Sequence, residues 1–146
     1  EVEIDRDTGF AEVVRYAAVE ELGRVLNPLL VAGQIHGGVV QGIGQALGEL
    51  IVHDPDSGQM LTASFMDYHM PRATEQPDFR LATREVPTAA NPLGAKGVGE
   101  AGTVGALAAA MNALNDALAP LGVRHFEMPA TPLRVWEAMQ GAAAAR

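Results

Sequence analysis

Six glycines inside one helix-like segment limit what this chain can fold into more than any other feature. They form three pairs at a spacing of four, Gly33/Gly37, Gly38/Gly42 and Gly44/Gly48. Asn27-Pro28 marks a helix start, and apolar residues then recur every three or four positions to about Ile51. Each glycine in a helix interior costs about 1 kcal/mol relative to alanine. We therefore expect another backbone or a ligand to approach this helix very closely.

Turn residues and alternating apolar residues predict the elements around this Gly-rich helix. They are a hairpin over residues 1–20, a second hairpin over 51–62, a strand over 79–86, a loop over 87–102, an Ala-rich helix over 103–118, a short strand over 123–127, a last helix over 132–140 and a frayed tail over 141–146. The predicted fold is α+β, with hairpins and a mixed sheet packed against the Gly-rich helix and the Ala-rich helix. We expect one domain over residues 1–140, because the sequence shows no internal repeat and no linker.

Composition argues against several classes of protein. The chain has 146 residues and a net charge of −8, which argues against a partner that is nucleic acid or an anionic membrane. It contains no cysteine, so it has no Cys-ligated iron–sulfur cluster and no thiol nucleophile. No apolar run reaches the ~18 residues that span a bilayer, and we expect a cytoplasmic protein without membrane insertion. The four histidines lack the spacing of metal ligands, so no metal is expected on them.

The loop over residues 91–103 is the most informative stretch for chemistry. Glu100 is the only acid between Glu85 and Asp116, and its neighbours are glycine, alanine and valine. Burial would raise the pKa of its carboxyl and make it a general base, although the N-terminus of the following helix would oppose this shift. The alternative is that Glu100 only caps the helix and that Lys96 is a solvated loop residue. The residues alone leave both interpretations open.

Two further hypotheses concern the glycines. Gly97, Gly99 and Gly102 form a GxGxxG pattern before a helix, which is typical of a stand-alone nucleotide- or dinucleotide-binding module. The context is poor, because the pattern does not directly follow a strand and no acid ends a strand about 20 residues downstream. The other hypothesis is a non-catalytic packing domain whose glycines serve only helix contact. Gln34, Gln41 and Gln45 lie near the glycine stripe, and their amides are candidates for facing a ligand.

Four motifs together resemble a known enzyme family. They are GQIHGGVVQGIGQAL over 33–47, NPLGAKGVGEAGT over 91–103, GRVLNP over 23–28 and MPATPLRVW over 128–136. The combination resembles the C-terminal part of the molybdenum-binding large subunit of the molybdenum hydroxylases. This family includes xanthine dehydrogenase, aldehyde oxidase and aerobic carbon monoxide dehydrogenase. The resemblance runs from Glu1 to about Gln140.

The resemblance implies a site and a cofactor. It implies that Glu100 is the catalytic base, and that Gln34 reaches a molybdenum-molybdopterin cofactor from the Gly-rich helix. Lys96, Gly97, Val98 and Gly99 would line the same cofactor, which we expect to be the cytosine dinucleotide form. The substrate would be a small carbonyl, N-heterocyclic or CO-type molecule, and these residues do not distinguish between the three.

The resemblance also implies what this chain lacks. The family's large subunit is several times longer, and the rest of it would hold most of the cofactor pocket. Iron–sulfur and FAD centres would lie in other subunits or domains. Alone, the chain is therefore expected to bind no cofactor and to be inactive. Its open, Gly-lined surface would favour self-association.

Overall fold

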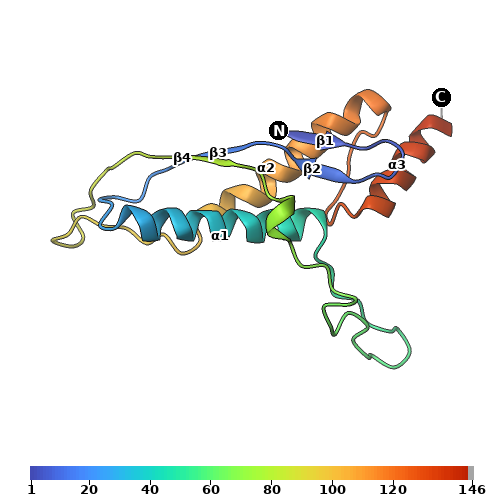
Figure 1. Ribbon diagram of the computed structural model, residues 1–146, viewed down its shortest axis with the longest axis horizontal. Helices are drawn as coiled ribbons and strands as arrows, with labels where there is room; N and C mark the ends of the chain where they lie inside the picture. The colour runs from blue at the N-terminus through green and yellow to red at the C-terminus, as the bar shows by residue number, and fades with distance from the viewer. Residues whose placement is uncertain (145–146) are drawn as a thin grey trace.

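The computed structural model describes residues 1–144, and its elements are two small sheets and three α-helices within that range (Figure 1). In chain order they are β1 Val2–Ile4, β2 Ala11–Val13, β3 Tyr16–Glu20, α1 Pro28–Leu47, the 3₁₀ turn η1 Ala73–Glu75, β4 Phe79–Thr83, α2 Ala101–Leu118, the 3₁₀ turn η2 Ala119–Leu121 and α3 Pro132–Ala144. The predicted α+β class is confirmed. Both predicted central helices are present, and the Asn27 side chain caps α1 by accepting a hydrogen bond from Leu30 N at 3.2 Å.

Helices α1 and α2 cross through residues that have little or no side chain. A Cβ added to Gly42 would lie 2.6 Å from Ala106 Cβ, and one added to Gly102 would lie 2.5 Å from Ile35 O. Thr103 Oγ1 donates a hydrogen bond to Gly38 O at 3.0 Å and so joins the two backbones. The expected close approach is confirmed for this part of the glycine stripe. Gly33 and Gly37 instead face open space.

The strands form two separate two-stranded sheets instead of one mixed sheet. β1 and β2 are antiparallel, whereas β3 and β4 are parallel and pair Tyr16 with Phe79. The first hairpin was predicted to continue through residue 20, and that part is wrong: its return strand ends at Val13. The next strand, β3, pairs with β4 instead. The Tyr16 and Phe79 rings pack edge to face in this pair, with their centroids 6.0 Å apart.

Other boundaries also differ from the prediction. The strand predicted over 79–86 ends at Thr83, and the Gly-rich helix ends at Leu47. The second hairpin is reduced to one bridge between His53 and Met60. Residues 123–127 form no strand, because the Asn115 side chain replaces a partner strand. Its amide accepts from Phe126 N at 2.8 Å and donates to Phe126 O at 3.1 Å. Helix α3 continues to Ala144, into the segment predicted to be a frayed tail; residues 145–146 of that tail lie outside the described range.

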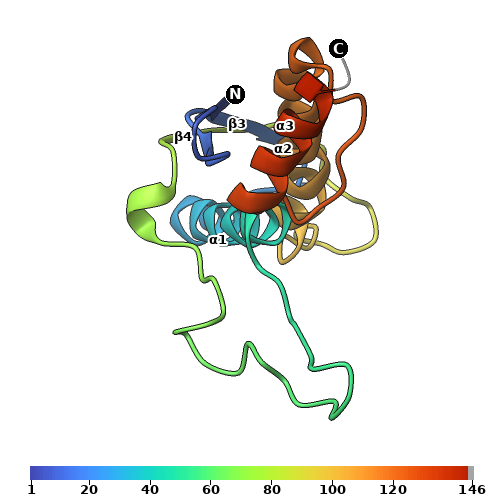
Figure 2. The same cartoon turned by 90° about the vertical axis from the view of Figure 1, so that its right-hand side faces the viewer.

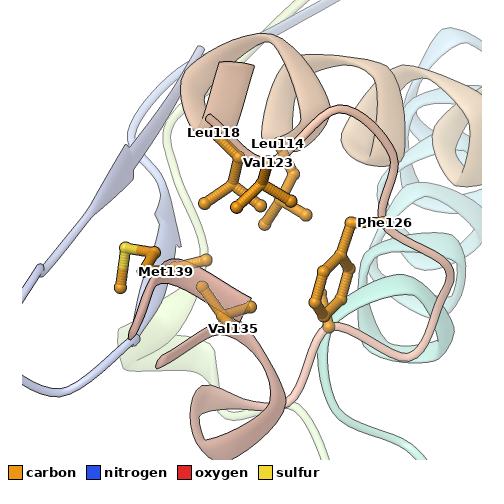
Figure 3. Packing of buried hydrophobic residues seen from close by; sticks show 8 residues of the cluster. Leu114, Leu118, Val123, Phe126, Val135 and Met139 are labelled. Carbon is orange, nitrogen blue, oxygen red and sulfur yellow. The ribbon is translucent and has the colours of Figure 1, made fainter. Parts of the chain in front are cut away.

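Two apolar clusters hold these elements together. The first joins the end of α2 to α3 and includes Leu114, Leu118, Val123, Phe126, Val135 and Met139 (Figure 3). The second lies between α1, α2 and the strands, and it includes Ile35, Val39, Ile43 and Ala106. In the described part of the chain, no helix is long and apolar enough to cross a membrane.

Residues 49–72 project from this body, although His69 and Pro71 near the end of the segment contact α1. This segment, which we call the arm, follows α1 and projects away from the helices before the chain returns at η1 (Figures 1 and 2). It contains a hydrogen-bonded turn at Asp54–Gly58 and the bridge between His53 and Met60, but no helix or strand.

Candidate functional site

The loop that carries Glu100 is fixed to the segment preceding α1. Gly23 and Ala95 form an antiparallel bridge, Arg24 N donates to Gly94 O at 2.9 Å and Lys96 N donates to Leu22 O at 3.0 Å. Gly23 and Gly94 have φ of +67° and +68°, a conformation that favours glycine. A Cβ on Gly23 would also lie 2.4 Å from Gly94 O. This contact sets the path of the loop toward α2.

An ion pair adds to this attachment. Lys96 Nζ donates to Glu21 Oε2 at 2.5 Å, and the other carboxylate oxygen accepts from Gly23 N at 2.7 Å. The hydrogen bonds from Lys96 and from Gly23 N lower the pKa of Glu21 below its usual range. Lys96 is therefore not simply a solvated loop residue, because its ammonium is bound to a carboxylate 75 positions earlier.

Three of the predicted cofactor residues converge on one pocket. Gln34 from α1 and Lys96 and Val98 from the loop line a pocket of about 210 Å³, together with Leu22 and Leu30. Pockets that enclose small-molecule ligands measure roughly 300–1,000 Å³. This pocket alone is therefore smaller than a site that encloses a whole cofactor.

The glycines of the loop divide into two groups. Gly94 and Gly102 are buried against protein: a Cβ on Gly94 would lie 2.9 Å from Pro87, and Gly102 packs on α1. Gly97 and Gly99 are exposed, and a Cβ on either would meet nothing within 4 Å. At these two positions a flat ring or a phosphate can approach the backbone amides. The residues present therefore fit a large planar cofactor at this surface.

Glu100 lies at the start of α2 and is exposed. Glu100 does occupy the N-cap position of α2, but its side chain makes no capping hydrogen bond. Its position is nevertheless fixed, because Val104 N donates to Glu100 O at 3.1 Å and Gly102 is pressed against α1 two residues later. The backbone of Glu100 is thus fixed next to Gly99, and its exposed carboxylate has no protein partner among residues 1–144.

The other candidates have local roles. Gln41 Oε1 lies 3.3 Å from Thr103 Oγ1 at the helix crossing, and Gln45 is exposed. The His36 ring lies 5.0 Å from the Phe79 ring. Within residues 1–144, no group of three or more His, Cys, Asp or Glu side chains is arranged to hold a metal ion.

The GxGxxG pattern does not occur in a dinucleotide-binding context. Strand β4 ends at Thr83, well before Gly97, and no strand follows α2 in the described residues. The parallel β4 pairs with β3, whose connection to it contains α1 and the arm. The βαβ unit that positions a pyrophosphate is therefore not formed around this loop.

Sequence reasoning missed the segment on which the loop rests. Glu21 binds Lys96, and the Glu85 carboxylate accepts from Val25 N at 2.8 Å. Asn91 closes the loop from within, since its side chain accepts from Ala95 N at 3.3 Å and donates to Ala95 O at 2.9 Å. The only signal for this segment in the sequence was the motif GRVLNP over 23–28, which begins inside the segment and continues to the start of α1.

Comparisons with known proteins identify the kind of domain that this geometry forms. Residues 1–77 match the family model of the molybdopterin cofactor-binding domain. The chain is 45% identical over 140 residues to the nicotine 6-hydroxylase large subunit of Paenarthrobacter nicotinovorans, covering 96% of this chain and 17% of the relative. It is 40% identical over 136 residues to the carbon monoxide dehydrogenase large chain of Afipia carboxidovorans, covering 93% of this chain and 17% of the relative.

The structural comparison agrees. Quinoline 2-oxidoreductase from Pseudomonas putida 86 superposes with a TM-score of 0.91 at 42% identity, over 97% of this chain and 18% of that one. The fold is that of a molybdopterin cofactor-binding domain. More narrowly, the chain belongs to the large-subunit family of the molybdenum hydroxylases. It spans about a sixth of the length of the relatives it matches, at 17–18%.

Proposed function

We propose that this chain forms one wall of a molybdopterin site and supplies the catalytic base Glu100 in a molybdenum-dependent oxidoreductase. The observation that carries the proposal is the convergence of Gln34, Lys96 and Val98 on one pocket. Next to this pocket, the open backbone at Gly97 and Gly99 leads to the Glu100 carboxylate, which has no protein partner in the described part of the chain. When bound, the molybdenum centre supplies the two-electron oxidation of the substrate.

In this proposal each residue has a distinct task. The Gln34 amide, which can both donate and accept, recognises heteroatoms of the pterin from α1. Gly97 and Gly99 give the cofactor access to backbone amides, and Val98 covers an apolar face. Lys96 contributes the stem of its side chain to the wall, while its ammonium stays paired with Glu21. Glu100 Oε1 or Oε2 accepts the proton that is released as the substrate is hydroxylated.

The complete enzyme would contain more than this chain. We infer that the cofactor is the cytosine dinucleotide form and that electrons leave through iron–sulfur and FAD centres in other subunits or domains. The names of the relatives support a multi-chain assembly, since they describe a "large subunit" and a "large chain". The substrate class is a small carbonyl, N-heterocyclic or CO-type molecule.

The test is Glu100→Gln in the complete enzyme. The substitution keeps the shape of the side chain and removes the proton-accepting charge, so we expect kcat to fall by ~10²–10⁴-fold. Molybdenum content should stay at the wild-type level. Glu137→Gln, which changes an exposed carboxylate on α3, is the matched control and should keep full activity. Wild-type turnover of a fully metallated Glu100→Gln enzyme would refute the assignment.

A further inference from the structure

Helices α1 and α2 run in the same direction where they cross (Figure 1). A Cβ on Gly102 would lie 2.5 Å from Ile35 O, and further along both helices one on Gly42 would lie 2.6 Å from Ala106 Cβ. The contact partners therefore advance together from the start of α2. Residues that precede these contacts on either helix consequently lie at the same end of the crossing.

Gln34 and Glu100 both lie at this end. Thr103 Oγ1 donates a hydrogen bond to Gly38 O at 3.0 Å. Glu100, the N-cap of α2, precedes Thr103 by three positions, and Gln34 precedes Gly38 by four. Residues three or four positions apart lie on the same face of a helix, about one turn from each other. The proposed cofactor residue and the proposed base are thus each about one turn away from a single hydrogen bond between their helices.

The Thr103 hydroxyl is the directional tie between the two helices. It is partly buried and has two acceptors on α1, Gly38 O and, at 3.3 Å, Gln41 Oε1. A hydroxyl carries one hydrogen, so it donates to one of them at a time. Within residues 1–144, both hydrogen bonds between α1 and α2 come from this hydroxyl. Apolar contacts have no preferred direction, whereas a hydrogen bond weakens as its atoms move out of line, so this bond limits how far α2 can slide along α1.

The Glu100 carboxylate depends on the placement of its backbone, because its side chain makes no capping hydrogen bond and has no protein partner in the described range. A general base must lie within hydrogen-bond reach of the proton that it accepts. A displacement of about 1 Å in a reacting group can cost ~10²-fold in rate. A small shift of the first turn of α2 would therefore impair Glu100 while leaving the fold intact.

We propose that Thr103 is a positioning residue, whose hydroxyl holds Glu100 in register with Gln34; this inference rests on the proposed function of Glu100. Thr103→Val keeps the branched shape of the side chain and removes the hydroxyl. We expect kcat to fall by ~10- to 100-fold. KM and molybdenum content should stay at the wild-type level, because Thr103 does not line the pocket at Gln34. Thr103→Ser keeps the hydroxyl and should restore kcat to near the wild-type value.

A double-mutant cycle in the complete enzyme tests whether Thr103 acts through Glu100. The rate at which saturating substrate reduces the enzyme is measured in a single turnover for wild type, Thr103→Val, Glu100→Gln and the double variant. We expect Thr103→Val to slow the wild-type enzyme and to leave the rate of the Glu100→Gln enzyme unchanged. An equal loss in both backgrounds would overturn this inference and leave Glu100 as the base. Wild-type turnover in Glu100→Gln alone would instead overturn the proposed function, and this inference with it.

Hydrogen exchange in the complete enzyme gives a readout that does not depend on activity. Loss of one hydrogen bond should raise the exchange rate in the first turn of α2 by about fivefold in Thr103→Val, and Thr103→Ser should return it to the wild-type rate. Thr83→Val makes the same change at an exposed position on β4, so this matched control should alter neither that exchange rate nor kcat. Wild-type exchange or wild-type kcat in Thr103→Val, or a Thr103→Ser enzyme as impaired as Thr103→Val, would overturn the proposal.

Discussion

At the scale of single residues, the pair Glu21–Lys96 determines where the loop begins its approach to α2. The pKa of Glu21 is lowered by hydrogen bonds from Lys96 and from Gly23 N. A carboxyl whose pKa is lower in the folded state stabilises the fold above its ordinary pKa, and this contribution is lost as the pH falls through the lowered value.

This coupling predicts a pH-dependent difference between two proteins. Wild type should melt at a higher temperature than Glu21→Gln near neutral pH. The gap should close as the pH falls below about 4, near and below the ordinary pKa of glutamate. Thermal melts of the two proteins between pH 3 and pH 7 measure this gap. A gap that persists unchanged at pH 3 would exclude Glu21 as its source.

At the scale of secondary-structure elements, the glycines of α1 divide into packing positions and open positions. Gly42→Ala would place a methyl group 2.6 Å from Ala106 Cβ, so we expect it to destabilise the chain by ~1–3 kcal/mol through overpacking. Gly37→Ala meets nothing within 4 Å and should stabilise α1 by about 1 kcal/mol through helix propensity. Denaturant unfolding measures both changes. Equal effects at the two positions would show that the crossing is not close-packed.

Elements with local signals could be predicted from the sequence, and elements that depend on distant partners could not. The start of α1 was predictable because Asn27 and Pro28 act on the turn that follows them. The β3–β4 pairing was not, since it joins residues about 60 positions apart. Residues 123–127 carry a strand-like pattern, but Asn115 satisfies the backbone of Phe126 in place of a strand.

The candidate site divides in the same way. Glu100 and the Gly-rich loop stood out because one acid among small residues is a local pattern. Their attachment to residues 21–24 did not, because a bridge between Gly23 and Ala95 has no signature in either segment alone. The exposure of Gly97 and Gly99, in contrast to the burial of Gly94 and Gly102, is likewise a tertiary property.

At the scale of the whole molecule, our proposal gives residues 1–144 one wall of a cofactor site and leaves the opposing wall to the rest of the large subunit. The pocket at Gln34 is about 210 Å³, and Leu29 beside it on α1 is 81% exposed. We expect the isolated chain to bind no molybdenum and to self-associate through its exposed apolar surfaces. Elemental analysis of the purified chain measures the first expectation, and sedimentation velocity measures the second. Stoichiometric molybdenum in the isolated chain would contradict the interpretation of the site as one wall.

The helix crossing has a consequence for how the site responds to heat. Gln34 and Glu100 belong to two different elements, and these elements touch backbone to backbone at Gly38, Gly102 and Thr103. The closest contacts here involve backbone atoms and the short Thr103 side chain, with the Gln41 amide oxygen 3.3 Å from Thr103 Oγ1 at the edge of the crossing. The spacing between the backbones that carry Gln34 and Glu100 is then set mainly by direct backbone packing and not by long side chains. As temperature rises, this spacing should stay constant until the helix pair itself separates.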